Sequence, residues 1–431
     1  MFYFYIFTTY SQSIVVAQLS LQLQKNNDIN MSIMRKIIPL TLFMSITLSS
    51  FSTGSPIYPA QVWLNDAPVA FNIKHSKVDR LVDLAFSDPA TQAVVLSKDG
   101  VIIGERYAEG FDSDSRATSW SMAKSFYAAL IGISIDRGEI DSLDDRVGKY
   151  LKYFNDDRSD ISIRHLLNMA SGLEMPDHEH ENMFFTQDHL AYAKSVMADK
   201  PPGALFEYNN VNSMLLADLL YQATGKPADQ LLQERIFSPI GIDDAILWRD
   251  AQGNPLTYCC VDATPRQYAR FGLLFARSGQ WQDQQIIPRD FVDETFRVVW
   301  DDLSSDTIQQ DRGYSLHWWI SRYDKNNQIF NASGKFGQYI FVDRANDLVF
   351  VRVTKYHPGE GTQQDWGPLK YINKLGDVDF RIKAAVFLEN IGLIDLGSSV
   401  RTPTTLDDGV SSEFFVNYSA VMDALTDLTQ P

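Results

Sequence analysis

The pattern of apolar and polar positions predicts strands in two separate parts of the chain. Residues 91–107, "TQAVVLSKDGVIIGERY", contain two β-rich runs around Asp99-Gly100, a dipeptide typical of tight hairpin turns. A later stretch, residues 328–356, reads as consecutive strands with a turn at 344–347. Early and late strands can therefore pair in one antiparallel sheet.

Between these strands, the apolar positions recur at helical spacing. Glycines act as stop signals, and Thr264 followed by Pro265 is a typical N-cap and first helical position. The expected helices cover 121–137 (ended by Gly138), 161–173 (a short helix closed by Gly172), 212–225 and 264–279. The layout is α+β: an antiparallel sheet from N- and C-terminal strands, with an inserted mainly helical region. The alternation of a parallel βαβ fold is missing.

The first 53 residues have a different pattern. Arg35 and Lys36 precede an apolar run that extends to about residue 50, which favours a secretory signal over a buried helix. We expect residues 1–33 to be a non-native or disordered extension and 34–53 a signal peptide. The folded domain should cover 60–395, and 396–431 should form a tail that packs on or beyond it. The protein is expected to be exported, periplasmic or secreted, without a stable membrane span.

Charge and cysteine content narrow the function further. The formal net charge of −16 argues against a nucleic-acid partner, which requires a basic face. The only two cysteines, Cys259 and Cys260, are adjacent, and adjacent residues form only an unusual disulfide. We expect two small buried side chains there, with a redox or metal role as the lesser alternative.

The first candidate for chemistry is Ser121-Met122-Ala123-Lys124, the only SxxK sequence in the chain. On a helix, positions i and i+3 share a face, so the amine can reach the hydroxyl. Burial favours a neutral lysine, which can take the serine proton and activate a nucleophile. The alternative is an ordinary helix start with a capping serine and a solvated Lys124.

A proton donor for the leaving group is the second requirement. Tyr-x-Asn occurs at Tyr153, Tyr208 and Tyr371. Tyr208 has the most favourable context, because it follows a Pro-Gly turn and precedes a predicted helix. A tyrosine near a lysine can shuttle a proton, and Asn210 can hold Lys124 or a substrate carbonyl.

The third element is Ala332-Ser333-Gly334, at the start of a predicted strand. Acyl transfer needs two backbone N–H donors for its oxyanion, and the candidates are those of Ser121 and Lys335. Gly334 would let a substrate approach the backbone closely. A strand with a glycine bulge is the alternative, and a shifted register would make Lys335-Phe336-Gly337 the motif.

The order SxxK, YxN, x-Ser-Gly resembles the serine β-lactamase and penicillin-binding-protein superfamily. The branch related to class C β-lactamases is most similar, and it includes D-alanyl-D-alanine carboxypeptidases, family VIII-type esterases and 6-aminohexanoate-dimer hydrolases. Segments such as "ISIRHLLNMASGL" and "PPGALFEYNN" extend the resemblance over residues 93–353. It implies a β-lactamase/transpeptidase-like fold. It also implies the following roles: Ser121 as acylated nucleophile, Lys124 as proton acceptor, Tyr208 as general acid/base, Asn210 in substrate orientation, and Lys335 as second oxyanion donor.

One position departs from that family. The third motif usually begins with a cation that helps to hold a substrate carboxylate, and here the position is Ala332. We therefore expect a serine hydrolase for a small ester or linear amide. The alternatives are a class C-type β-lactamase or D-Ala-D-Ala carboxypeptidase, and a non-catalytic penicillin-binding-like module. No cofactor is expected, and no metal, although His178 and His180 form a His-x-His pair.

Overall fold

The computed structural model describes residues 56–355 and 412–430, apart from 61, 177–178, 185, 301–312 and 325–326, together with isolated positions between 384 and 393. The extension and signal peptide predicted for residues 1–53 lie outside the described residues. Within the described part, no helix has both the length and the apolar character needed to cross a bilayer.

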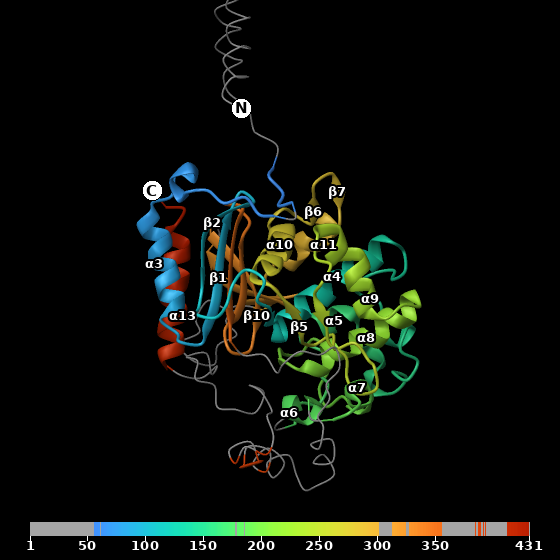
Figure 1. Ribbon diagram of the computed structural model, residues 1–431. Coiled ribbons are helices and arrows are strands. Elements are labelled where there is room, and N and C mark those ends of the chain that lie inside the picture. Colours follow the sequence, from blue (N-terminus) through green and yellow to red (C-terminus); the bar gives the residue numbers. More distant parts are fainter. Residues whose placement is uncertain are drawn as a thin grey trace, which may run out of the picture. The chain divides into compact units, whose positions relative to one another are not determined.

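A seven-stranded antiparallel sheet lies at the centre of the fold, in the order β2-β1-β12-β11-β10-β9-β8 (Figure 1). Val95 of β1 pairs with Glu105 of β2 on one side and with Val351 of β12 on the other. The prediction that early and late strands share one sheet is therefore confirmed. The strands are β1 (Thr91–Lys98), β2 (Val101–Tyr107), β8 (Gly313–Ser315), β9 (Trp318–Asp324), β10 (Asn327–Gly334), β11 (Gln338–Asp343) and β12 (Leu348–Thr354).

The turn between β1 and β2 has the predicted geometry. Asp99 (φ 53°) and Gly100 (φ 80°) both have left-handed backbone, as the tight hairpin turn requires. A side chain at Gly100 would also collide with the carbonyl oxygen of Ile57, 1.9 Å from its Cβ. Both the backbone angle and the close approach explain the glycine.

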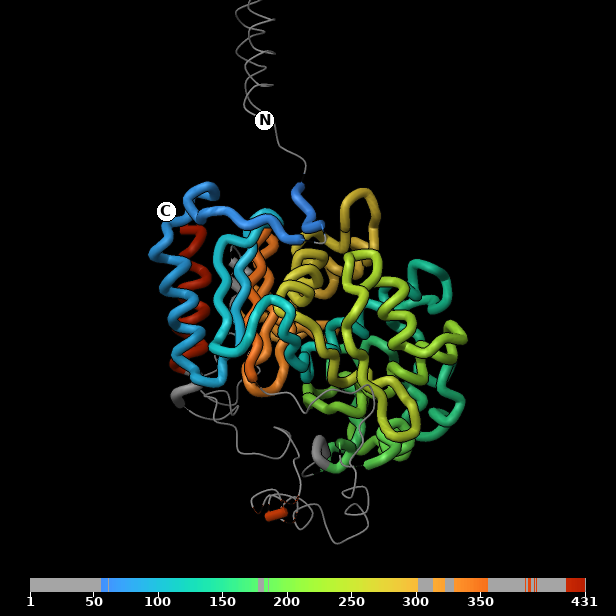
Figure 2. Tube along the Cα trace, in the orientation of Figure 1, coloured from blue at the N-terminus to red at the C-terminus, as the bar shows by residue number. Residues whose placement is uncertain are grey.

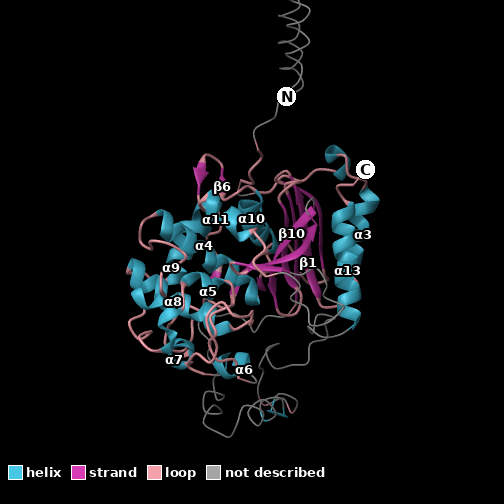
Figure 3. Ribbon diagram, turned by 180° about the vertical axis from the view of Figure 1, so that it is seen from behind, coloured by secondary structure: helices cyan, strands magenta, loops and turns pink. Residues whose placement is uncertain are grey.

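Helices α3 (His75–Phe86) and α13 (Ser412–Asp427) cover one face of the sheet (Figures 1 and 3). Val94 and Leu96 of β1 contribute to the buried cluster on this face. The Asn417 amide donates to the Leu84 carbonyl at 3.0 Å and joins the two helices. Part of the stretch predicted as a C-terminal tail thus packs against α3.

The opposite face of the sheet packs against α10 (Pro265–Ala276) and the helical region. Ala93 and Val95 alternate with the residues above and belong to this second, larger cluster. Figure 2 follows the chain from the first strands, through the helical region, back to the sheet. The remaining elements are η1 (Pro68–Phe71), η2 (Trp120–Met122), α4 (Ala123–Asp136), η3 (Val147–Lys149), η4 (Asp157–Asp160), α5 (Ile163–Leu167), α6 (Glu179–Phe184), α7 (His189–Ser195), α8 (Asn210–Thr224), α9 (Ala228–Leu232), η5 (Gln233–Phe237), η6 (Ser238–Ile240) and α11 (Arg289–Thr295), with the short strands β3 (Ala117–Thr118), β4 (Ile246–Leu247), β5 (Val261–Ala263), β6 (Gln280–Trp281) and β7 (Gln284–Gln285).

The predicted helix ends at Thr264, Gly225 and Gly138 agree with the structure, and the one at Gly172 differs. Thr264 caps α10, and Gly225 ends α8 with left-handed backbone, as expected. The helix predicted to close at Gly172 instead ends at Leu167. Gly172 has another reason to be glycine, because its Cβ would lie 2.1 Å from the carbonyl oxygen of Lys200.

Candidate active site

Ser121 and Lys124 lie where the short turn η2 passes into helix α4. Every residue from Ala123 to Ser134 is buried, so α4 carries Lys124 into the core, where it is 1% exposed. The Lys124 amine is 2.9 Å from the Ser121 hydroxyl and donates at 2.7 Å to the carbonyl of Tyr258. The alternative of a solvated lysine is therefore wrong. At 2.9 Å, a proton can pass between the hydroxyl and a neutral amine.

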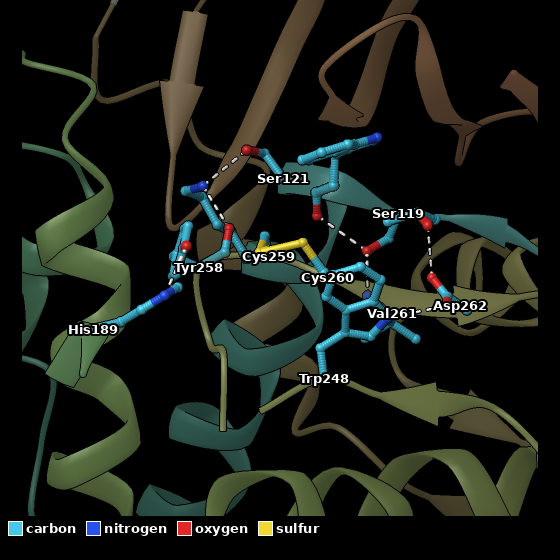
Figure 4. Close-up of a disulfide and its surroundings, with 12 residues drawn as sticks. Ser119, Ser121, His189, Trp248, Tyr258, Cys259, Cys260, Val261 and Asp262 are labelled. Carbon is cyan, nitrogen blue, oxygen red and sulfur yellow. Dashed lines mark hydrogen bonds between the residues drawn. A yellow bond between two sulfur atoms is a disulfide. The ribbon is translucent and has the colours of Figure 1, made fainter. Parts of the chain in front are cut away.

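The backbone immediately before Ser121 is held in an uncommon conformation. Trp120 has φ 45°, a left-handed value that bulky residues rarely adopt. The preceding residue, Ser119, is held by Val261 of β5. The Ser119 N–H donates to the Val261 carbonyl at 2.7 Å, and the Ser119 hydroxyl accepts from the Val261 N–H at 2.8 Å (Figure 4). Such conformations persist only when the surroundings determine them, and here β5 supplies two of those contacts.

Tyr208 lies beside Lys124 within a group of aromatic rings. The Lys124 Nζ atom is 5.1 Å from the centre of the Tyr208 ring. Trp319 stacks on Tyr208 with 5.5 Å between ring centres, and Tyr314 meets it edge-on at 6.3 Å. Trp319 is half-buried, whereas its neighbour Trp318 is buried in the core. The other described tyrosine of this pattern, Tyr153, is half-buried and bonds Asp218; Tyr371 lies outside the described residues.

The end of β10 touches the loop that carries the serine. A Cβ on Gly334 would lie 2.2 Å from the carbonyl oxygen of Ser119 and 3.2 Å from the Cβ of Trp120. Just past the strand, Phe336 packs edge-on against Trp120 with 5.6 Å between ring centres. This close approach places Gly334 against the loop that carries Ser121.

The other predicted residues lie at the start of α8 and around the end of β10. Asn210 is the first residue of α8 and is 8% exposed. Ala332 is fully buried in the core, Ser333 is half-buried, and Lys335 is exposed in the loop between β10 and β11. The substrate and oxyanion roles of Asn210, Ser333, Gly334 and Lys335 stay predictions.

Cys259 and Cys260 are buried as expected, but the expectation of two separate thiols is wrong. They form a disulfide between adjacent residues, next to Tyr258 (Figure 4). Tyr258 was not predicted from the sequence, yet its carbonyl accepts from Lys124 and its ring centre lies 5.7 Å from the same amine. Its hydroxyl pairs with Nδ1 of His189 at 3.0 Å. The physical reason is tertiary: the bend at 258–260 brings the chain back against α4.

His317 is a second residue near the site that was not predicted from the sequence. Its ring pairs with Ser213 through Nε2 at 3.0 Å and with the Tyr314 hydroxyl through Nδ1 at 3.3 Å. Burial holds the pKa of His317 well below its usual value. Burial likewise raises the pKa of Tyr314. A neutral histidine therefore links two buried hydroxyl groups behind the lysine.

No group of three or more potential metal-binding side chains is found among the described residues. His178 lies outside them, and the structure describes only the backbone of His180, in α6. The candidate site is the group of neighbouring side chains of Ser121, Lys124 and Tyr208.

The sequence profile of the Beta-lactamase family matches residues 88–370. The 6-aminohexanoate-dimer hydrolase of Paenarthrobacter ureafaciens is 22% identical over 302 residues, which cover 64% of this chain and 76% of that protein. The D-aminopeptidase of Brucella anthropi is 32% identical over 175 residues, 37% of this chain. The chain spans only 33% of that relative's length.

Solved structures show the same fold at low sequence identity. A Bacillus anthracis protein described as a candidate 6-aminohexanoate-dimer hydrolase superposes with a TM-score of 0.59 at 21% identity, covering 77% of this chain and 90% of that one. A family VIII carboxylesterase gives a TM-score of 0.52 at 17% identity, covering 73% and 98%. The predicted β-lactamase/transpeptidase-like fold is confirmed. Because the family profile covers more than half of its length, the chain belongs to the beta-lactamase family, as its sequence predicts.

Proposed function

We propose that this protein is a serine hydrolase that cleaves an ester or a linear amide bond through a covalent acyl-enzyme on Ser121. The observation that carries the proposal is the 2.9 Å contact between the Lys124 amine and the Ser121 hydroxyl, in a buried setting. The named relatives are hydrolases of amide bonds and esters, which supports the same reaction class.

The reaction proceeds in two halves. Neutral Lys124 takes the hydroxyl proton while the Ser121 oxygen attacks the substrate carbonyl carbon. The resulting oxyanion accepts hydrogen bonds from the N–H groups of Ser121 and Lys335. Tyr208, fixed beside Lys124, delivers a proton to the leaving alcohol or amine. Water then attacks the ester of the acyl-enzyme, the acid leaves, and the Ser121 hydroxyl is restored.

The substrate preference follows from Ala332. A substrate carboxylate next to the scissile bond would meet a buried methyl group at this position, where the family usually provides a cation. Removing a carboxylate from water without a counter-charge is costly. Neutral esters and linear amides, including 6-aminohexanoate oligomers, are therefore the proposed substrates, with Asn210 and Ser333 in substrate contacts.

We also propose that the protein is exported to the periplasm or secreted. The apolar run after Arg35 and Lys36 supports this, because it has the length and flanks of a signal peptide. The disulfide agrees with an oxidising compartment. N-terminal sequencing of the mature protein from a periplasmic fraction tests this proposal. A mature chain that begins at Met1 would contradict it, and so would recovery of the protein in the cytosolic fraction.

A fluorophosphonate probe tests the nucleophile directly. We expect the wild-type protein to be labelled and Ser121→Ala to be unlabelled. Ser115→Ala, in a turn where the hydroxyl bonds Asp112, serves as a matched serine control and should be labelled normally. Lack of wild-type labelling, or labelling that survives Ser121→Ala, would contradict the proposal and favour a non-catalytic module.

Three substrates then separate the possible reactions: p-nitrophenyl butyrate, the linear 6-aminohexanoate dimer and a chromogenic cephalosporin. Turnover of the ester or the dimer should exceed that of the cephalosporin. Fast cephalosporin turnover with a weak ester rate would instead identify a β-lactamase. Tyr208→Phe should lower kcat by about 10²–10⁴-fold, the usual contribution of a general acid or base.

A further inference from the structure

The disulfide lies between two groups of hydrogen bonds to the catalytic loop. On one side, the Tyr258 carbonyl accepts from the Lys124 amine at 2.7 Å. On the other side, the Val261 carbonyl accepts from the Ser119 N–H at 2.7 Å, and the Val261 N–H donates to the Ser119 hydroxyl at 2.8 Å. Figure 4 shows Cys259 and Cys260 between these two anchor points.

These contacts bracket the nucleophile. Ser119 and Lys124 lie on either side of Ser121 in the sequence, and both are held by the same short segment, residues 258–261. The distance between the Tyr258 carbonyl and the Val261 amide therefore helps to set where Lys124 lies relative to Ser121. That distance depends on the backbone angles of the two residues between them, Cys259 and Cys260.

A bond between adjacent side chains restricts these backbone angles directly. Both cysteines are buried, at 3% and 0% exposure, so the ring they close is packed within the core. Opening the ring returns rotational freedom to two residues, and it places two separate thiol groups in the same close-packed space. The anchor points on either side would then shift or become mobile.

We propose that the Cys259–Cys260 disulfide is a positioning element of the active site, which holds Lys124 and Ser119 in register around Ser121, and that its reduction turns the enzyme off. This inference rests on the proposed hydrolase function. Reduction by a dithiol is a two-electron step. One thiolate of the reagent attacks a cysteine sulfur, breaks the S–S bond and expels the other cysteine as a thiolate, which leaves a mixed disulfide. The second thiolate of the reagent then attacks its own sulfur in the mixed disulfide and expels the remaining cysteine, so the protein gains two thiols and the dithiol becomes a cyclic disulfide.

The consequence is an activity confined to oxidising surroundings. In a reducing cytoplasm the precursor would hold two thiols and a misaligned lysine. After export, formation of one bond would complete the site. The segment that carries the disulfide thus links the redox state to catalysis without contacting the substrate.

Purified full-length protein tests this inference with p-nitrophenyl butyrate. Thiol titration in denaturant first counts free thiols before and after dithiothreitol, since the chain has no other cysteines. Reduction should lower kcat at least about tenfold, because misplacement of a catalytic group by a fraction of an ångström slows chemistry. KM should change much less, the acidic limb of the pH profile should shift, and removal of the reductant with reoxidation should restore kcat.

The double variant with Cys259→Ser and Cys260→Ser provides a matched control. It should have the low kcat of the reduced protein, with or without dithiothreitol, and an unchanged circular dichroism spectrum. Full kcat in the reduced protein or in this variant would overturn the inference, as would two free thiols in active oxidised protein. A loss of activity that parallels loss of structure, with the pH profile unmoved, would also overturn it.

Fluorophosphonate labelling distinguishes this failure from failure of the proposed function. Oxidised protein that is not labelled at Ser121 would refute the hydrolase itself. Oxidised protein that is labelled, and is labelled equally fast after reduction, would refute only the positioning role of the disulfide.

Discussion

The substitution Gly334→Ala tests whether the contact between β10 and the serine loop sets the catalytic geometry. A Cβ at this position would lie 2.2 Å from the Ser119 carbonyl oxygen, and ordinary contact begins at 3.4 Å, so the atoms must separate by about 1 Å. Ser119 cannot yield easily, because Val261 holds both its N–H and its hydroxyl. The strain must therefore separate Ser121 from the end of β10, where Lys335 is proposed to bind the oxyanion.

A displacement of 1 Å at a reacting group costs about 100-fold in rate, which corresponds to about 2.7 kcal/mol in the activation barrier. We expect kcat/KM for p-nitrophenyl butyrate to fall by about this factor in Gly334→Ala. The rate of fluorophosphonate labelling should fall in parallel, because it reports the same attack by Ser121.

The control is Gly110→Ala, at an exposed turn where no atom lies within 4 Å of the added Cβ. Its left-handed backbone should cost about 1–2 kcal/mol of stability and leave kcat/KM unchanged. Both variants are compared by thermal melting and by steady-state kinetics. Wild-type kcat/KM in Gly334→Ala would refute the reasoning, as would an equal loss of activity in both variants.

Three further predictions concern the base, the buried histidine and the buried ion pair. Lys124→Met keeps the volume of the side chain but removes the amine, so kcat/KM should fall by about 10²–10⁴-fold; ester turnover near the wild-type rate would contradict the proposed base. Because the pKa of His317 is held well below 6.5, the unfolded chain binds a proton that the native one does not, and stability should fall as the pH drops through 6.5. Melts of His317→Gln should show a smaller decrease over that range, and an identical pH dependence would count against this origin. Arg352 donates to fully buried Asp88 at 2.6 Å, so Arg352→Met should lower the free energy of unfolding by about 3–5 kcal/mol, whereas Arg106→Met, at an exposed pair, should cost less than about 1 kcal/mol in the same urea titration.

The hairpin was predicted correctly because its signal is local. The hairpin follows from Asp99-Gly100 with β-rich residues on both sides, and all of this information lies within one short segment. Pairing of early with late strands follows from the order of the elements. An edge strand exposes unpaired backbone N–H and C=O groups, and a second set of strands can pair with them. The helix predicted to end at Gly172 was misjudged, since that glycine accommodates the Lys200 carbonyl, a contact that no local pattern reveals.

The same distinction applies to the site. Ser121 and Lys124 are three positions apart, and helical spacing alone brings them together. The acceptor for Lys124 is the Tyr258 carbonyl, 134 residues away, and the Ser213 partner of His317 is 104 residues from it. Every residue has a carbonyl, so composition cannot indicate which one faces the lysine. Tertiary packing decides these contacts, and it also brings the adjacent cysteines to the lysine.

The position of Ala332 connects the fold to the choice of substrate. Side chains alternate along β10, so Ala332 lies on the same face of the strand as Gly334, which touches the loop that holds Ser121. The methyl group is therefore on the side of the sheet that faces the proposed nucleophile, and it is fully buried. The charge of Lys335 cannot replace the missing cation at this place, because its side chain is exposed beyond the end of the strand and its amine lies 5.1 Å from the Phe336 ring. A substrate carboxylate at Ala332 would lose its water and gain no partner there, whereas a neutral chain would bury apolar surface. The burial of Ala332 at this strand end thus supports the proposal of acyl groups without an adjacent charge.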